Sequence, residues 1–126
     1  MADVPPSKLL RFVHFPSFLR DWRRLGLDDE VMMVLERELI DAPGKAPVIR
    51  HTGGLRKLRF APPDLGRGKR GACRVCYAYF PSHGAVALFA VFGKNERSDL
   101  SPDETRAIGE ALKGFESELR RQFDQR

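Results

Sequence analysis

Basic residues concentrate in the middle of the chain, in patterns suited to contact with phosphate groups. Between residues 53 and 77 the single acid is Asp64, and the basic residues are Arg56, Lys57, Arg59, Arg67, Lys69, Arg70 and Arg74. Lys57 and Arg59 alternate with apolar residues, which places charge on one face of a strand and apolar side chains on the other. A cationic strand face beside a glycine-rich basic loop suits a chain of phosphates, so we expect nucleic acid, and RNA first, as the partner.

The individual basic residues have different expected roles. Arg74 lies in an apolar segment typical of an interior strand, and a partly buried arginine needs an anion. Lys69 and Arg70 lie between glycines, so we expect them to steer phosphate rather than to do chemistry. The alternative for Lys57 and Arg59 is that they are ordinary solvated charges on a strand face.

The cysteines and histidines do not form a recognisable metal site. Cys73 and Cys76 form a lone C-x-x-C motif, and zinc would need two more ligands. The three histidines, at positions 14, 51 and 83, are not spaced as ligands. Residues three apart on a strand also point to opposite faces. We therefore expect no metal and no cofactor, and interpret both cysteines as small strand residues.

The composition describes the domain that must position these residues. The chain has 126 residues, of which 42% are hydrophobic, and this is enough for one domain, residues 1–126, with one core. Residues 1–7 are expected to form a loose arm. No hydrophobic leader and no membrane-length apolar run is present, so we expect a cytoplasmic protein.

The first half is expected to hold one strand and a helical hairpin. Residues 8–14 are predicted as a strand. A helix is predicted from Pro16 or Ser17 to Gly26, and a second from Asp28 or Asp29 to the Pro43-Gly44 pair. Trp22 is expected to pack this hairpin onto the sheet. The buried stripe of the second helix is predicted to contain Val31, Met32, Val34, Leu35 and Leu39.

The second half is expected to hold a three-stranded meander and a closing helix. The strands are predicted at 55–60, 72–80 and 85–93, the last covered on both faces because it is almost entirely apolar. Ser101 and Glu104 form a capping box for a helix that runs to about residue 121. Its inward residues are predicted to be Ile108, Leu112, Phe115 and Leu119. The fold class is α+β.

Charge is distributed unevenly over these elements. The net charge is +5, yet the second predicted helix, residues 28–41, is acidic with Arg37 as its only basic residue. This helix has the wrong sign for RNA. We interpret it as a surface for solvent or for a protein partner.

Four motifs, in their order and spacing, resemble the RelE/HigB family of type II toxins, most closely its HigB-like branch. They are Gly53-Gly54-Leu55-Arg56-Lys57-Leu58-Arg59, Gly68-Lys69-Arg70-Gly71, Arg74-Val75-Cys76-Tyr77 and Gly93-Lys94-Asn95-Glu96-Arg97-Ser98-Asp99-Leu100-Ser101. The resemblance extends from about Phe15 to Leu112. It implies a RelE-like fold with a small antiparallel-rich sheet, an N-terminal helical hairpin and a C-terminal helix.

The resemblance also implies an activity and partners. Such a toxin is a ribosome-dependent mRNA endoribonuclease, a hydrolase that inhibits translation without a metal. Its expected partners are the ribosome, mRNA and a co-encoded antitoxin of helix-turn-helix type, through which it reaches operator DNA. No membrane partner is expected.

The family's cleavage, attack of a ribose 2′-hydroxyl on the neighbouring phosphate, implies roles for residues of this chain. Lys57 and Arg59 match the family's strand pair, and Arg74 matches its arginine on the next strand. With Lys94 they form the expected catalytic set, and the expected RNA-binding residues are Arg56, Lys69 and Arg70. Crowded cations disfavour the ammonium form, which makes Lys57 the expected proton acceptor, while arginines clamp phosphate.

Two departures from the family pattern keep other functions open. Some relatives have an arginine where this chain has Asn95 and a tyrosine near Ser101, so the general acid is not identified. The alternatives are a non-catalytic RNA- or protein-binding module of the same fold, and a regulatory partner of an antitoxin at operator DNA.

Overall fold

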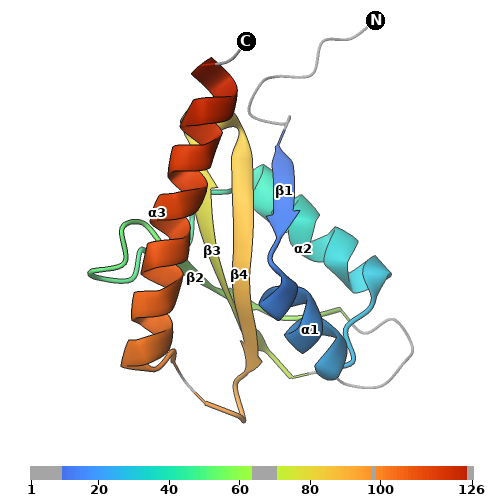
Figure 1. The fold of residues 1–126 in the computed structure, drawn as a ribbon. Coiled ribbons are helices and arrows are strands. Elements are labelled where there is room, and N and C mark those ends of the chain that lie inside the picture. Colours follow the sequence, from blue (N-terminus) through green and yellow to red (C-terminus); the bar gives the residue numbers. More distant parts are fainter. Residues whose placement is uncertain (1–9, 64–70, 98, 125–126) are drawn as a thin grey trace, which may run out of the picture.

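A mixed β-sheet with helices on both faces forms the described part of the chain, residues 10–63, 71–97 and 99–124 of a computed structural model (Figure 1). The elements are β1 (Arg11–His14), α1 (Pro16–Arg24), α2 (Asp29–Asp41), β2 (Arg56–Phe60), β3 (Cys73–Phe80), the short 3-10 turn η2 (Pro81–His83), β4 (Ala85–Gly93) and α3 (Pro102–Asp124). The order and types agree with the sequence prediction, and the α+β class is confirmed.

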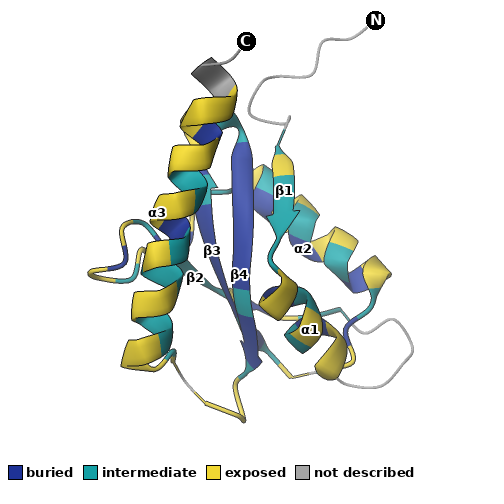
Figure 2. Ribbon diagram, in the orientation of Figure 1, coloured by how far each residue is buried: buried dark blue, intermediate teal, exposed yellow. Residues whose placement is uncertain are grey.

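The sheet has the strand order β1-β4-β3-β2. β2, β3 and β4 form the predicted antiparallel meander, and β1 adds to the far side of β4 in parallel. β4 is therefore an interior strand between two neighbours, with helices on both faces. This explains its nearly unbroken apolar sequence, and Figure 2 shows β3 and β4 as the most continuously buried part of the sheet.

The α1–α2 hairpin covers one face of the sheet. Trp22 is buried and stacks between Phe18 and Phe60, with ring centroids 5.5 and 6.2 Å away. Its indole nitrogen donates to the Asp28 carbonyl. The Asp28 carboxylate also accepts from the Val31 amide at 3.0 Å and caps α2. The predicted packing role of Trp22 and capping role of Asp28 are confirmed.

The buried stripe of α2 is narrower than predicted. Val31, Leu35 and Leu39 are buried, whereas Val34 is 39% exposed and Met33 is 64% exposed. The three buried residues are four apart and advance by only about 40° per step around a helix with 3.6 residues per turn. Val34 lies outside that strip, so its predicted burial was wrong, and it contributes to an exposed apolar surface.

α3 covers the opposite face, and its start is fixed as predicted. The Glu104 amide donates to the Ser101 hydroxyl at 3.1 Å, and the Ser101 amide donates to the Glu104 carboxylate at 2.9 Å. These two bonds form the capping box. Leu112 and Leu119 are buried against the sheet, and the helix continues to Asp124, three residues beyond the predicted end.

The predicted basic residues of β2 and β3 lie toward one end of the sheet, where the turn after β4 leads into α3. None of the helices in the described part of the chain is long and apolar enough to cross a bilayer.

Candidate nucleic-acid interface

Three of the predicted basic residues share the sheet face on which α3 lies. Leu58 and Phe60 pack with the hairpin-side core, so strand alternation turns Lys57 and Arg59 to the other face. Arg59 pairs directly with Arg74 across β2 and β3, and Lys57 pairs with Cys76. Directly paired side chains have Cβ atoms about 4.5–5.5 Å apart, and like charges at that spacing repel each other. An anion placed between them would relieve this repulsion.

Arg74 has an unused hydrogen-bond donor. Its Nη1 atom is inaccessible to solvent and has no hydrogen-bond partner in the described part of the structure. A buried donor left unpaired costs about 1–3 kcal/mol. Arg74 lies on the interior strand β3, as predicted, and its guanidinium therefore favours a ligand with acceptor oxygens.

Carboxylates from the first turn of α3 and from the segment before it pair with cations near this face. The Asp99 carboxylate is 3.3 Å from the Lys57 ammonium. Arg97 lies over the ring of Phe92, 4.7 Å from its centroid, and also pairs with Glu104. That hydrogen bond, opposed by partial burial, lowers the pKa of Glu104 to about 2 and raises the pKa of Arg97. The site is thus a mixed cluster in which two of the cations, Lys57 and Arg97, already form ion pairs with carboxylates.

Arg97 is a candidate that sequence reasoning missed. Phe92 pairs with Arg74 across β3 and β4, so the ring beneath Arg97 is a direct neighbour of the predicted site. The motif from Gly93 to Ser101 included this arginine. Strand alternation, however, gives no direction for a side chain that follows a turn, and the prediction selected Lys94 instead.

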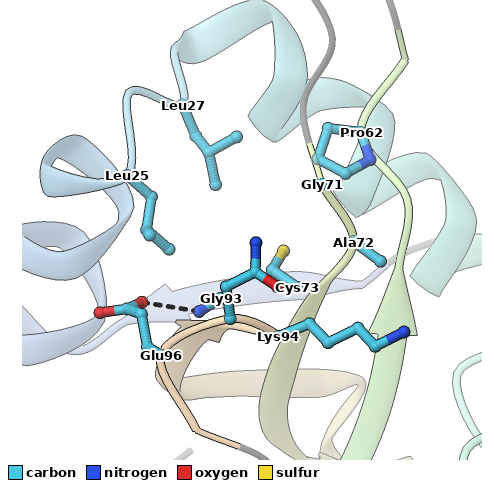
Figure 3. Close-up of a pocket in the computed structure, with 10 residues that line it drawn as sticks. Leu25, Leu27, Pro62, Gly71, Ala72, Cys73, Gly93, Lys94 and Glu96 are labelled. Carbon is cyan, nitrogen blue, oxygen red and sulfur yellow. Dashed lines mark hydrogen bonds between the residues drawn. The ribbon is translucent and has the colours of Figure 1, made fainter.

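Lys94 lies one residue beyond the end of β4. Its amide donates to the Ala72 carbonyl at 3.2 Å, which extends the β3–β4 ladder by one step. Alternation from Gly93 then gives Lys94 the same side as Arg74. In Figure 3 its side chain points away from Leu25 and Leu27. No ion pair to Lys94 is found within the described residues.

Of the predicted RNA-binding residues, the structure describes only Arg56. Arg56 faces the hairpin side, where its Nη1 donates to the carbonyls of Gly44 and Ala46 at 3.0 and 2.6 Å. The structure therefore gives Arg56 a role in holding the loop after α2 and separates it from Lys57 and Arg59. Lys69 and Arg70 lie outside the described residues, so their predicted role stays a prediction.

The described cysteines are not suited to nucleophilic or metal chemistry as they stand. Cys73 packs with the hairpin-side core and Cys76 with the α3-side core, as the spacing predicted. Burial raises the pKa of Cys73 to about 11 and of Cys76 to about 12, so both thiols are protonated at neutral pH. Within the described residues, no three His, Cys, Asp or Glu side chains cluster as metal ligands.

The histidines are placed away from the cationic strands. His14 lies on β1 and bonds to Glu36 of α2 at 2.7 Å. His51 is in the loop before β2, and His83 is in η2. The arrangement of Lys57, Arg59, Arg74 and Arg97 can bind and polarise a phosphate, but it lacks an imidazole acid–base pair on these strands.

A pocket of about 400 Å³ opens at the same end of the sheet (Figure 3). Its apolar wall comes from the α1–α2 connection and from β3, and its other wall comes from the turn after β4. The lining residues are Leu25, Leu27, Pro62, Gly71, Ala72, Cys73, Gly93, Lys94, Asn95 and Glu96. Lys94 belongs both to this rim and to the predicted site.

Comparison with known proteins supports the fold. No family model matches the chain. Among solved structures, it is similar to a double arginine-to-alanine variant of the E. coli toxin RelE in the free state, with a TM-score of 0.51 and 16% sequence identity. The match covers 82% of this chain and 97% of that chain. The HigB-like branch is not supported by this match and stays a prediction. The chain therefore has a RelE-like α+β fold.

Proposed function

We propose that this chain is the toxin of a type II toxin–antitoxin system and inhibits translation by cleaving mRNA on the ribosome. The observation that carries the proposal is the buried Nη1 of Arg74, which has no partner among the described residues and lies beside Arg59 on a RelE-like sheet. Arginine recognises phosphate through paired donors. The proposed site of action is the cytoplasm, where ribosomes translate mRNA.

The proposed reaction is an internal transfer within the RNA backbone. The ribose O2′ forms a bond to the adjacent phosphorus while the bond from phosphorus to O5′ breaks, which leaves a 2′,3′-cyclic phosphate and a 5′-hydroxyl. Arg74 and Arg59 stabilise the added negative charge on the phosphorane, and positioned cations of this kind are usually the largest catalytic contribution. Lys94 and Arg97 extend the positive charge toward the turn after β4.

Lys57 is proposed to take the O2′ proton, but its present contact must change first. Its ammonium is 3.3 Å from the Asp99 carboxylate, so this ion pair must open and the ammonium must release a proton to solvent before the neutral amine can accept the O2′ proton. Asp99 is 59% exposed and so can be displaced toward solvent. An RNA phosphate that binds Arg74 would also repel Asp99. The group that protonates O5′ is not supplied by these residues.

The ribosome is proposed to complete the site. Isolated cations without a histidine pair bind phosphate better than they transfer protons, so the chain alone should cleave RNA slowly. The test is purified protein with mRNA, in the presence and absence of programmed ribosomes. We expect cuts within the mRNA only with ribosomes. Equal rates on free RNA would indicate an ordinary ribonuclease.

A non-catalytic RNA-binding module of the same fold is the second candidate. The pairing of Lys57 with Asp99 and of Arg97 with Glu104 favours it, because both cations are partly neutralised. Such a module would bind RNA through Arg59 and Arg74 and leave mRNA intact in the same ribosome assay.

A further inference from the structure

We propose that the pocket between the α1–α2 connection and the turn after β4 takes one unstacked base of the RNA bound at the cationic face. This inference rests on the proposed function and names a second contact with the same substrate. It assigns the choice of base to Asn95, which sequence reasoning noted only as a position where some relatives have an arginine.

The pocket has an apolar wall of the kind a base needs. Leu27 and Cys73 are buried and Leu25 is half-buried, so these side chains present an apolar surface held by the core. A volume of about 400 Å³ accommodates a single heterocycle with room for water. Single-stranded RNA is recognised through splayed bases that enter such sites.

The opposite wall is held in place by a chain of polar contacts. The Glu96 carboxylate accepts from the Gly93 amide at 2.7 Å (Figure 3). It also accepts from the Arg24 guanidinium at 2.7 Å. These hydrogen bonds lower the pKa of Glu96, so the carboxylate is ionised and fixed. A Cβ at Gly93 would lie 3.3 Å from the Glu96 carboxylate, a tight contact that a small shift of the glutamate side chain would relieve. The wall is therefore formed before any ligand binds.

Asn95 offers a group for reading the edge of a base. It lines the pocket, is exposed, and carries an amide with both donors and an acceptor. Amide side chains form paired hydrogen bonds with base edges. The neighbouring Glu96 has its carboxylate engaged by Gly93 and Arg24, so Asn95 is the better placed of the two to discriminate between bases.

The pocket meets the cationic face only around the end of the sheet. Cys73 lines the pocket on the hairpin side, whereas the next residue on β3, Arg74, points to the α3 side. Lys94 stands on the rim, with its side chain directed away from the apolar wall (Figure 3). A nucleotide at the end of the sheet could therefore place its phosphate near Lys94 and its base against Leu27, while its neighbour in the RNA binds Arg74.

The test is an NMR titration of the full chain with uncleavable probes. These are the four 2′-O-methyl RNA homohexamers and an abasic hexamer with the same number of phosphates. We expect the methyl signals of Leu25 and Leu27 to shift with at least one homohexamer and not with the abasic one. The backbone signals of Lys57 and Arg74 should shift with both kinds of probe.

The affinity difference between the preferred homohexamer and the abasic hexamer should be about tenfold, within the range for contacts to base edges. Asn95→Ala should reduce this difference several-fold. Gln122→Ala, which removes an exposed amide on α3 far from the pocket, should leave it unchanged.

Shifts at Lys57 and Arg74 without any at Leu25 and Leu27 would overturn the base pocket and leave the proposed function standing. No shift at either place would count against both proposals.

Discussion

Arg74 is the residue on which the proposed chemistry depends most. The residue is half-buried, and its Nη1 is a buried donor without a hydrogen-bond partner among the described residues. Arg74→Ala should therefore abolish growth arrest on induced expression while the protein stays folded. Loss of one such charge-stabilising donor corresponds to about 3 kcal/mol of transition-state stabilisation. Growth curves and far-UV circular dichroism measure the two parts of this prediction.

Two further variants separate charge from geometry. Arg74→Lys keeps the charge but loses the paired donors, so it should restore only part of the toxicity. Arg106→Ala removes an exposed arginine of α3 that pairs with Asp103, and this variant should stay fully toxic. Full toxicity of Arg74→Ala would mean that the site is misplaced.

Asp99 competes with RNA for Lys57. The two charged groups are 3.3 Å apart and the carboxylate is mostly exposed, so the pair is weak, on the order of 0.2–1 kcal/mol. Asp99→Asn should raise affinity for single-stranded RNA by up to about fivefold, since a bound phosphate no longer has to displace a carboxylate. Fluorescence anisotropy at fixed salt measures the change.

The control for Asp99 is Asp103→Asn, which removes the same charge from an exposed position on α3. It should change RNA affinity less than Asp99→Asn does. An equal gain in both variants would indicate a general effect of net charge, and Asp99 would then have no special relation to Lys57.

The start of α3 links stability to the site. Glu104 both closes the capping box with Ser101 and pairs with Arg97 over Phe92. Its pKa is lowered from 4.5 to about 2, chiefly by Arg97, so its stabilising contribution is complete above pH 4.5 and is lost as the pH falls through about 2. Glu104→Gln should therefore lower the melting temperature at pH 7, and the difference from the parent protein should narrow as the pH falls.

Melting curves between pH 7 and pH 3 test this expectation. Glu110→Gln, on the exposed side of α3, is the matched control and should melt like the parent protein throughout. The loss of a capping interaction is worth about 1 kcal/mol. A difference that stayed constant with pH would mean that the ionised carboxylate is not what stabilises the helix start.

Elements with strong periodicity were predicted well, whereas side-chain contacts made with turn and loop residues were not. The all-apolar β4 and the Ser101–Glu104 capping box carry local signals, and both were found where predicted. Arg56 is on a correctly predicted strand, but its loop partners Gly44 and Ala46 come from a distant segment that no local pattern reveals. Arg97 was missed for the same reason, because its position depends on the path of a turn.

At the scale of the whole molecule, the cationic strand residues and the acidic helix α2 lie on opposite sides of the sheet. Lys57, Arg59 and Arg74 share the α3 side, whereas the acidic α2 packs on the other. Their convergence was predictable, since alternation and strand order place residues on a face. The Lys57–Asp99 contact was not, because it depends on side chains meeting across the turn after β4. The two surfaces can therefore serve different partners.

We expect a co-encoded protein partner on the acidic side of the sheet, because this side is separated from the cationic strands. α2 exposes Met33 and Val34 in a pocket rimmed by Glu30 and Arg37, on a helix with more acids than bases. We expect a small protein from the adjacent gene to bind here through a basic amphipathic segment and to raise the melting temperature with concentration. The gain in the free energy of unfolding is about 2.7 kcal/mol when the partner's concentration is a hundredfold above Kd.

Met33→Asp should weaken the complex with the partner and leave RNA binding unchanged. Arg59→Ala should weaken RNA binding and leave the complex with the partner unchanged. Isothermal titration of each variant with the partner, with and without RNA, measures both. Competition by RNA would instead place the partner over Lys57 and Arg74, and the absence of any binding by the neighbouring gene product would favour the stand-alone binding module.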